Sequence, residues 1–244
     1  MEGVVDFDRS VSVGAWALNQ CKGNENTAIG HAALFAANGT GDTENTAIGA
    51  FAGQSLTSGQ RSTFLGMLAG NGSNFNNISC IGYNSGATAD NQVQLGDSNT
   101  DTYCWNSIQI RSDLRDKSDV RDTVLGLEFI KLLRPVDFRW DYRVDYHEYD
   151  SKGIRTTTME DVESKKDGSK KRNRFHHGVI AQEVKEVIDS TGKDFGGYQD
   201  HKINGGEDRL SIGYDEFIGP LIKAVQELSA ENEALKARLD AAGL

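Results

Sequence analysis

A serine and a lysine stand five residues apart in the segment RSDLRDKSDV, which covers residues 111–120. A neutral lysine can take the proton of a serine hydroxyl, and the oxygen can then attack a carbonyl carbon, so Ser112 and Lys117 have the residue types of a Ser-Lys peptidase dyad. The same residues also fit a turn or helix start at Ser112 with a surface lysine. Because serine and lysine at this spacing are common, the pair alone leaves both interpretations open.

The charge of the chain bears on what it binds. Its 244 residues carry 36 acidic and 26 basic side chains, a net charge of -10. A protein that coats nucleic acid needs clustered lysine and arginine, so we expect no nucleic-acid partner. The one basic cluster, within residues 165–174, is interleaved with Ser164, Asp167, Gly168 and Ser169 and is typical of a solvated loop.

The cysteines and the apolar runs exclude several further classes. Cys21, Cys80 and Cys104 are odd in number and lack C-x-x-C spacing, which predicts neither a disulfide framework nor a metal site. We expect no cofactor, and assembly in a reducing cytoplasm. No apolar run has the length of a membrane span and no signal peptide opens the chain, so we expect no membrane insertion.

The sequence before Ser112 and Lys117 differs in character from the sequence after them. Residues 1–111 repeat a pattern of Ser or Thr, an apolar residue, Gly and small residues, as in NTAIGHAAL (26–34), NTAIGAFAG (45–53) and STFLGMLAG (62–70). The marker glycines lie 14 to 19 residues apart and are Gly14, Gly30, Gly49, Gly66, Gly82 and Gly96. A short repeat with strand-length cores and polar turns predicts a β-solenoid or β-roll shaft.

Each repeat carries one Ile or Leu, which is little for a core closed by one chain. Three chains winding together would place three such side chains at one axis, with backbone pairing between the chains. The repeat therefore predicts a homotrimer with interchain β-structure. The alternative is a monomeric β-solenoid with an internal core. Residues 10–97 resemble the head repeats of trimeric autotransporter adhesins and the NTAIG repeats of phage tail-fibre shafts, a resemblance that concerns architecture and says little about a ligand.

The second half predicts an α+β domain. We expect a helix through DVRDTVLGLEFIKLL, capped by Ser118 and ended at Pro135, and then a strand over 136–143. A short strand leads into a helix from about Ala181, and RLSIGYDEF (209–217) predicts a strand running into a final helix.

The final helix, residues 218–242, has apolar residues at alternating spacings of three and four, with one Asn at an a position. This pattern predicts a C-terminal coiled coil, and the Asn would fix register or oligomer state. A parallel trimer matches the trimer inferred from the repeats, although the pattern alone fits a dimer almost as well. The predicted trimer seam is Ile218, Leu221, Val225, Leu228, Asn232, Leu235, Leu239 and Ala242.

Four motifs follow one another before that coiled coil: SDLRDK (112–117), LLRPVDFRW (132–140), HGVIAQEV (177–184) and IGPLIKAVQEL (218–228). Residues 112–244 resemble the self-cleaving intramolecular chaperone domain of phage endosialidases, tailspikes and L-shaped tail fibres, also found in a membrane-bound eukaryotic transcription factor. The resemblance implies two domains, 1–111 and 112–244. It also implies a chaperone that trimerises, aligns the upstream fibre of the same chain and then cuts itself off.

The resemblance also implies the roles of individual residues. The cut would fall between Arg111 and Ser112, with Ser112 as nucleophile and Lys117 as general base. A lysine that acts as a base must lose its proton, which requires desolvation in the assembled domain. Asp113 and Arg115 would organise the turn. The resemblance places His177 and Gln182 in a motif that could orient the site, the alternative for His177 being a structural histidine.

One position departs from the family pattern, because the residue before the lysine is more often apolar and here it is Asp116. An acidic neighbour favours the charged lysine and works against its role as base. The expected function is the C-terminal part of a virion tail fibre or tailspike, assembled in the host cytoplasm, with a host receptor or glycan as the expected external partner. The alternative is a non-cleaving trimerisation cap. A polysaccharide-degrading enzyme is disfavoured, since the repeats lack paired carboxylates in apolar surroundings.

Overall fold

The computed structural model describes residues 9–151 and 155–243. The first eight residues of the predicted domain 1–111 therefore lie outside the described part. The chain forms two compact units, each discontinuous in sequence, whereas the predicted division falls at a single point. The first unit comprises Met1–Tyr103, Asp141–Arg172 and His201–Arg209, and the second comprises Cys104–Trp140, Asn173–Asp200 and Leu210–Leu244.

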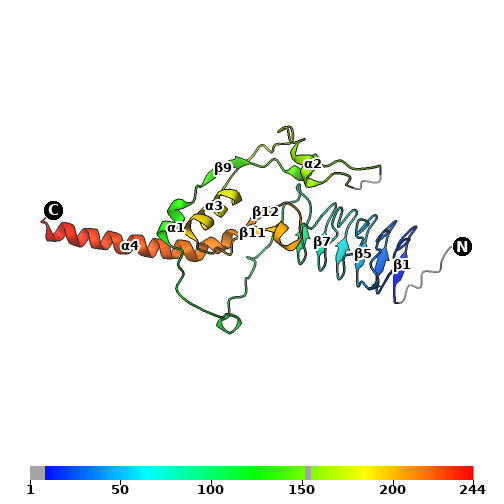
Figure 1. Cartoon of the computed structure of the whole chain (residues 1–244), viewed down its shortest axis with the longest axis horizontal. Helices are drawn as coiled ribbons and strands as arrows, with labels where there is room; N and C mark the ends of the chain where they lie inside the picture. Colours follow the sequence, from blue (N-terminus) through cyan, green and yellow to red (C-terminus); the bar gives the residue numbers. More distant parts are fainter. Residues whose placement is uncertain (1–8, 152–154, 244) are drawn as a thin grey trace. The chain divides into compact units, whose positions relative to one another are not determined.

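The repeats of the first unit form a β-solenoid, as predicted. Each contributes one three-residue strand to a parallel sheet of six strands with no slip in register (Figure 1). The strands, in sheet order, are β1 (Val11–Val13), β3 (Thr27–Ile29), β5 (Thr46–Ile48), β6 (Thr63–Leu65), β7 (Ser79–Ile81) and β8 (Val93–Leu95). A second, two-stranded ladder joins β2 (Gly23–Asn24) and β4 (Gly41–Asp42).

The solenoid closes its own core, so the prediction of backbone pairing between chains is wrong. The middle residue of most strands is fully buried, as Ala28, Ala47, Phe64 and Cys80 are, because alternate residues of a strand face opposite sides. Larger apolar side chains enter from the turns and fill the space that the alanines leave. These fully buried turn residues are Leu18, Leu34, Leu56 and Ile78.

Buried asparagines tie successive turns together. The side-chain oxygen of Asn26 accepts the backbone N–H of Asn45 at 3.0 Å, and the side-chain oxygen of Asn45 accepts the backbone N–H of Ser62 at 3.0 Å. Asn45 also donates to the carbonyl of Gly59 at 3.1 Å. Since a buried backbone amide without a partner is costly, the Asn of the repeat is explained by these bonds.

The marker glycines form a ladder of close backbone contacts. Gly49 has φ +135, and a Cβ there would lie 2.6 Å from the carbonyl carbon and oxygen of Gly66 in the next turn. Gly30 stands in the same relation to Gly49, with a Cβ 2.4 Å from the Gly49 oxygen. Glycine is required at these positions because no side chain fits between the turns.

Replacing Gly49 with alanine is expected to lower the free energy of unfolding by at least about 2 kcal/mol, because the new Cβ meets backbone that cannot yield. Urea titration followed by circular dichroism measures the change. Gly219→Ala is the control, since a Cβ at this helical position has no neighbour within 4 Å. An unchanged midpoint for Gly49→Ala would contradict the close contact between turns.

The second unit contains three α-helices and two small antiparallel sheets among its described residues. Leu125, Phe129, Val184, Phe195 and Phe217 are its buried core. The sheets pair β9 (Val136–Arg139) with β10 (Phe175–Gly178), and β11 (Tyr198–Asp200) with β12 (Leu210–Ile212). The helices are α1 (Leu127–Leu132), α3 (Ala181–Thr191) and α4 (Ile218–Ala241), with 3-10 turns at Leu114–Asp116 and Tyr214–Phe217. The first unit adds α2 (Met159–Glu163) and 3-10 turns at Arg143–Tyr146 and His201–Asn204.

The predicted helix start at Ser118 is wrong. Residues 118–126 are not helical, and α1 begins only at Leu127, whose backbone N–H donates to the Glu227 carboxylate at 2.7 Å. A side chain from α4 thus replaces the local serine cap, and a Cβ at Gly126 would collide with it.

The helix ends before Pro135 as predicted, and α3 begins at Ala181 as predicted. The strand predicted over 136–143 is shorter, since β9 ends at Arg139.

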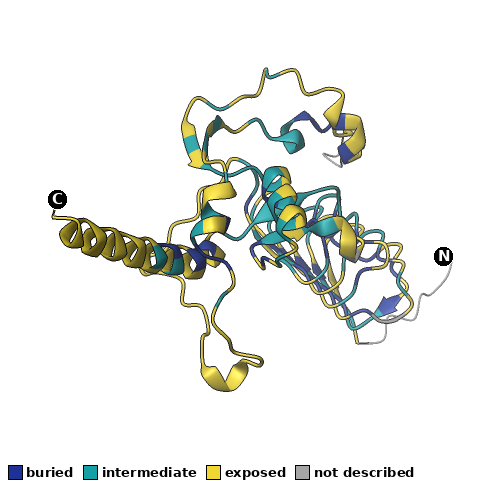
Figure 2. Cartoon of the chain, turned by 60° about the vertical axis from the view of Figure 1, so that its left-hand side comes forward, coloured by how far each residue is buried: buried dark blue, intermediate teal, exposed yellow. Residues whose placement is uncertain are grey.

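Helix α4 confirms the predicted final helix, and its apolar side chains are exposed in the single chain. Figure 2 shows it exposed along most of its length. Six residues of the predicted seam are 46 to 66% exposed, namely Ile218, Leu221, Val225, Leu228, Leu235 and Leu239. A single chain does not test the predicted coiled coil.

Candidate self-cleavage site

Ser112 and Lys117 lie side by side. Lys117 Nζ donates to Ser112 Oγ at 2.7 Å. The 3-10 turn Leu114–Asp116 lies between them and folds the chain back, so that residues five apart in sequence face one another. The backbone N–H of Lys117 donates to the carbonyl of Leu114 and closes the turn.

Asp113 and Arg115 hold this turn. The Asp113 carboxylate caps it by accepting the backbone N–H of Arg115 at 2.9 Å, and it also pairs with the Arg115 guanidinium at 2.6 Å. The side-chain hydrogen bonds from Arg115 lower the pKa of Asp113, so the carboxylate stays ionised at neutral pH. Both side chains are engaged with each other and with the turn, the arrangement expected of residues that organise it.

The surroundings of the pair are open. Every residue from Asp101 to Asp122 is exposed, including the apolar side chains of Ile108, Ile110 and Leu114. Exposed apolar side chains of this kind are typical of an interaction surface. The single chain thus leaves the Ser112–Lys117 pair open to solvent.

The two remaining predicted site residues lie on other elements. His177 lies on β10, where its Nδ1 is 2.6 Å from Oδ1 of Asp137 on the paired strand β9, with both side chains exposed. Gln182 is the second residue of α3 and is exposed. Within the described residues, no hydrogen bond joins His177 or Gln182 to Ser112 or Lys117.

A comparison with protein families identifies the family of the segment that begins at Ser112. Residues 112–193 match a peptidase family model whose description is chaperone of endosialidase. This segment is a chaperone-of-endosialidase domain. The match begins at Ser112 and ends just after α3, so β11, β12 and α4 lie beyond it. A search of curated proteins found no match to the chain.

Part of the chaperone domain packs on the solenoid inside the first unit. The Arg155 backbone N–H donates to the Asn71 side chain at 3.2 Å, and its guanidinium donates to the Gly72 carbonyl at 3.0 Å and to Glu207 at 2.7 Å. A Cβ at Gly72 would lie 2.4 Å from Arg155 Nε, so glycine leaves room for the arginine. Sequence reasoning missed Arg155, because a single arginine in a polar stretch carries no local pattern.

His147, from the same domain, is buried beside these charges. Its Nδ1 lies 2.9 Å from Thr157 Oγ1. Burial lowers the pKa of His147 from 6.5 to about 4, and the positive charge of Arg155 is the second largest cause. The negative charge of Glu207 raises this pKa, and the positive charge of Arg209 lowers it further. The imidazole is therefore neutral at pH 7.

A His147→Gln variant tests this pKa. The unfolded chain takes up a proton near pH 6.5 while the folded chain resists it until about pH 4, so the contribution of His147 to stability is full above pH 6.5 and declines as the pH falls. Between pH 7 and pH 5 the wild type is expected to lose about 1–2 kcal/mol more than His147→Gln in urea unfolding. His31→Gln, at an exposed ring, is the control, and equal pH slopes for wild type and His147→Gln would contradict the assignment.

The described residues show neither a metal cluster nor a membrane-spanning helix. In residues 9–151 and 155–243, no cluster of three or more His, Cys, Asp or Glu side chains is placed to hold a metal ion. Over the same residues, no helix combines the length and apolarity of a membrane span. Cys21 and Cys80 are free and buried, and burial raises the pKa of both thiols, whereas Cys104 is free and exposed.

Proposed function

We propose that the chain belongs to a homotrimeric phage tail fibre or tailspike in the virion. Its chaperone domain brings three chains together and sets the register of their solenoids, and it then releases itself by cutting between Arg111 and Ser112. The observation that carries this proposal is the chaperone-of-endosialidase match over residues 112–193, which follows a repetitive β-solenoid in the same chain.

The solenoid offers a surface suited to a trimer. The third residue of each strand points outward, and these six residues form an apolar row along the sheet, each 39 to 54% exposed. A continuous apolar row on a soluble protein indicates an interaction surface. In the proposed trimer the three solenoids meet through these side chains, without interchain backbone pairing. The row consists of Val13, Ile29, Ile48, Leu65, Ile81 and Leu95.

The seam of α4 supplies the second contact. Its exposed apolar residues follow the heptad spacing that coiled coils bury, with Asn232 at one a position. A helical coiled coil forms from local contacts, whereas aligning three solenoids requires correct register over many similar repeats. Trimerisation through α4 would raise the effective concentration of the three solenoids and favour their alignment.

The proposed cleavage is an N-to-O acyl shift followed by hydrolysis. Lys117, as the free amine, takes the proton from Ser112 Oγ, which attacks the carbonyl carbon of Arg111 through a five-membered ring. The Arg111–Ser112 C–N bond then breaks, and the Ser112 nitrogen receives the proton and becomes an amine. Water hydrolyses the resulting ester, which restores the hydroxyl and leaves a carboxylate on Arg111. The intramolecular geometry supplies a large effective molarity and limits the protein to one turnover.

Release of the chaperone would make the stability of the fibre kinetic. A trimer that has lost the domain that assembled it cannot retrace its assembly path. The upstream fibre of the same chain is thus the partner on which the chaperone acts. A host receptor or glycan remains the expected target of the finished fibre.

A non-cleaving trimerisation cap is the second candidate, because two observations favour it. Asp116 adds a negative charge next to the lysine, and Arg155 joins the chaperone domain to the solenoid through Asn71 and Gly72. Intact and native mass spectrometry of freshly purified wild type separates the two. Trimeric fragments that meet at Arg111/Ser112 support the cleaving chaperone, and an uncut trimer supports the cap. An uncut monomer would refute both.

A further inference from the structure

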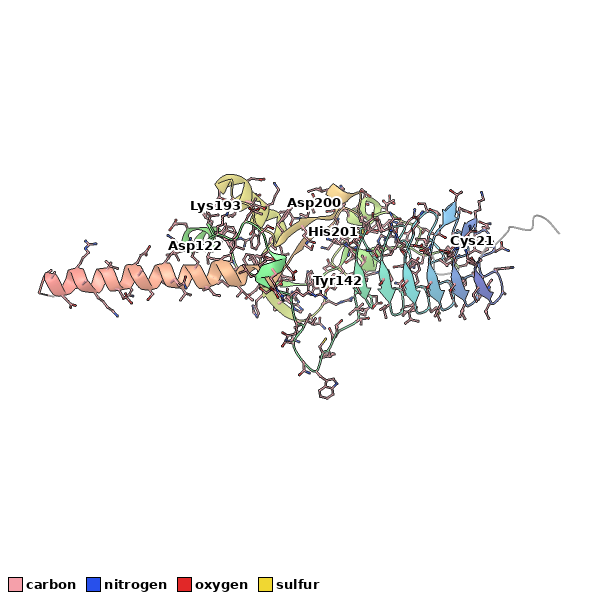
Figure 3. The ribbon with its side chains drawn as sticks, turned by 90° about the horizontal axis from the view of Figure 1, so that it is seen from below. Cys21, Asp122, Tyr142, Lys193, Asp200 and His201 are labelled. Carbon is pink, nitrogen blue, oxygen red and sulfur yellow. The ribbon has the colours of Figure 1, made fainter. Side chains whose placement is uncertain are left out.

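The first unit contains a cleft of about 710 Å³ that the proposed function does not use. It lies beside the β8 end of the solenoid, where Figure 3 labels Tyr142 and His201. One wall consists of residues between 71 and 101, and the others come from residues between 142 and 149, from Arg155, Lys170 and Arg172, and from Glu207 and Arg209. Its volume falls within the range of about 300–1,000 Å³ that is typical of small-molecule sites.

The lining of the cleft is polar and electrically balanced. Four basic and four acidic side chains face it, together with His147, which is neutral at pH 7. Three tyrosines, Tyr83, Tyr142 and Tyr149, also line it. Val144 is its one large aliphatic side chain among the described residues. An apolar ligand would leave these polar groups without partners, and an anion would meet as many negative as positive charges.

Three residues that line the cleft have buried polar atoms without a hydrogen-bond partner. Among the described residues, His147 Nε2, Arg209 Nε and Glu207 Oε2 are buried and have no hydrogen-bond partner. His147 is 6% exposed. The nearest guanidinium nitrogen of Arg209 is 3.6 Å from Glu207 Oε2, too far for a good hydrogen bond. These groups include both a donor and an acceptor, and each such group in a folded protein requires an explanation.

We propose that this cleft binds a neutral oligosaccharide. A sugar hydroxyl both donates and accepts hydrogen bonds, so neighbouring hydroxyls can satisfy a guanidinium N–H and a carboxylate oxygen together. The exposed rings of Tyr83 and Tyr149 offer apolar faces for the C–H side of a sugar ring while their hydroxyls stay polar. No net charge on the ligand is required, because the charges of the lining balance.

The cleft depends on residues on both sides of the proposed cut, so release of the chaperone domain would remove the binding site. All the lining residues from Tyr142 onward follow the proposed cut, so the site exists only while the chaperone domain remains on the solenoid. Binding of a saccharide would join those parts to the solenoid and oppose release. This inference needs the fold of the first unit alone and holds whether or not cleavage occurs.

Saturation-transfer NMR on the full chain tests the proposal, with Ser112→Ala as the background so that the chain stays whole. The probes are maltotriose and N,N′,N″-triacetylchitotriose as neutral sugars, and 3′-sialyllactose as an acidic one. Tyr149→Ala and Arg209→Met remove one ring face and one unsatisfied donor. Tyr103→Ala is the matched control, because Tyr103 is exposed and lies outside the cleft. Circular dichroism verifies that each variant folds.

The expected result is binding of a neutral probe that weakens at least tenfold in Tyr149→Ala and in Arg209→Met and is unchanged in Tyr103→Ala. Binding of sialyllactose alone would overturn the proposal in favour of an anion site. Binding that neither cleft variant weakens would place the sugar elsewhere and also overturn it. Binding of no probe at millimolar concentration would mean that the cleft holds water only.

Discussion

Ser112→Ala is expected to leave the chain whole, because it removes the only atom that can form the five-membered ring with the Arg111 carbonyl. Intact mass spectrometry at successive times after purification measures the uncut fraction. Lys117→Ala is expected to slow the reaction by a factor on the order of 10³ or more, since no other base contacts Ser112 Oγ within the described residues. Both variants should still form trimers.

Ser118→Ala is the matched control for this experiment. Ser118 follows Lys117 directly and is exposed like Ser112, and it has no part in the proposed chemistry. Its cleavage rate should equal that of the wild type. Cleavage of Ser112→Ala at the wild-type rate would refute the dyad, and cleavage elsewhere in the chain would point to contaminating protease.

Removal of residues 221–244 is expected to abolish efficient trimerisation, because it deletes nearly the whole exposed seam of α4. A finer test is the double variant Leu228→Asp/Leu235→Asp. Burying one leucine contributes about 1.5–3 kcal/mol, so each substituted position, counted in three chains, costs a trimer on the order of 5–9 kcal/mol. Light scattering at micromolar concentration should find trimers for the wild type and monomers for the double variant.

Ser229→Asp is the control for charge on α4, since Ser229 lies outside the seam and is exposed. It should remain trimeric. Trimers in the double variant would mean that the apolar row of the solenoid suffices for assembly, and the chaperone role would then have to be abandoned. A wild type that is dimeric would assign the heptad to a two-stranded coiled coil.

The β-solenoid fold of the repeats could be predicted from the sequence. The side of each strand that faces the core could not. The repeat spacing and the marker glycines predict the strands, because parallel turns stack directly upon one another. The large Ile of each repeat suggested a core that needs three chains. In fact the neighbouring Ala faces inward, and leucines such as Leu18 and Leu34 enter from turns with φ of +55 and +48. Left-handed backbone is rare for leucine, and no local pattern predicts it.

At the candidate site, local contacts were predictable and distant ones were not. The turn between Ser112 and Lys117 depends on residues within five positions of one another, so the sequence indicates it directly. The cap of α1 comes instead from Glu227, a hundred residues away, and replaces the expected Ser118. Arg155 likewise finds its partners through tertiary packing with Asn71 and Glu207. Such long-range polar contacts leave no periodic signal in one sequence.

Because whole repeats stack on one another, the length of this shaft grows slowly with the number of residues. Each turn adds one strand spacing, about 4.7–4.9 Å, whereas an α-helix rises about 1.5 Å for every residue. Since a turn here takes 14 to 19 residues, the solenoid gains roughly 0.3 Å per residue, about a fifth of what a helix would gain. Such a shaft lengthens slowly and in fixed steps. Added repeats would mainly enlarge the lateral surface presented to the surroundings and would add little reach.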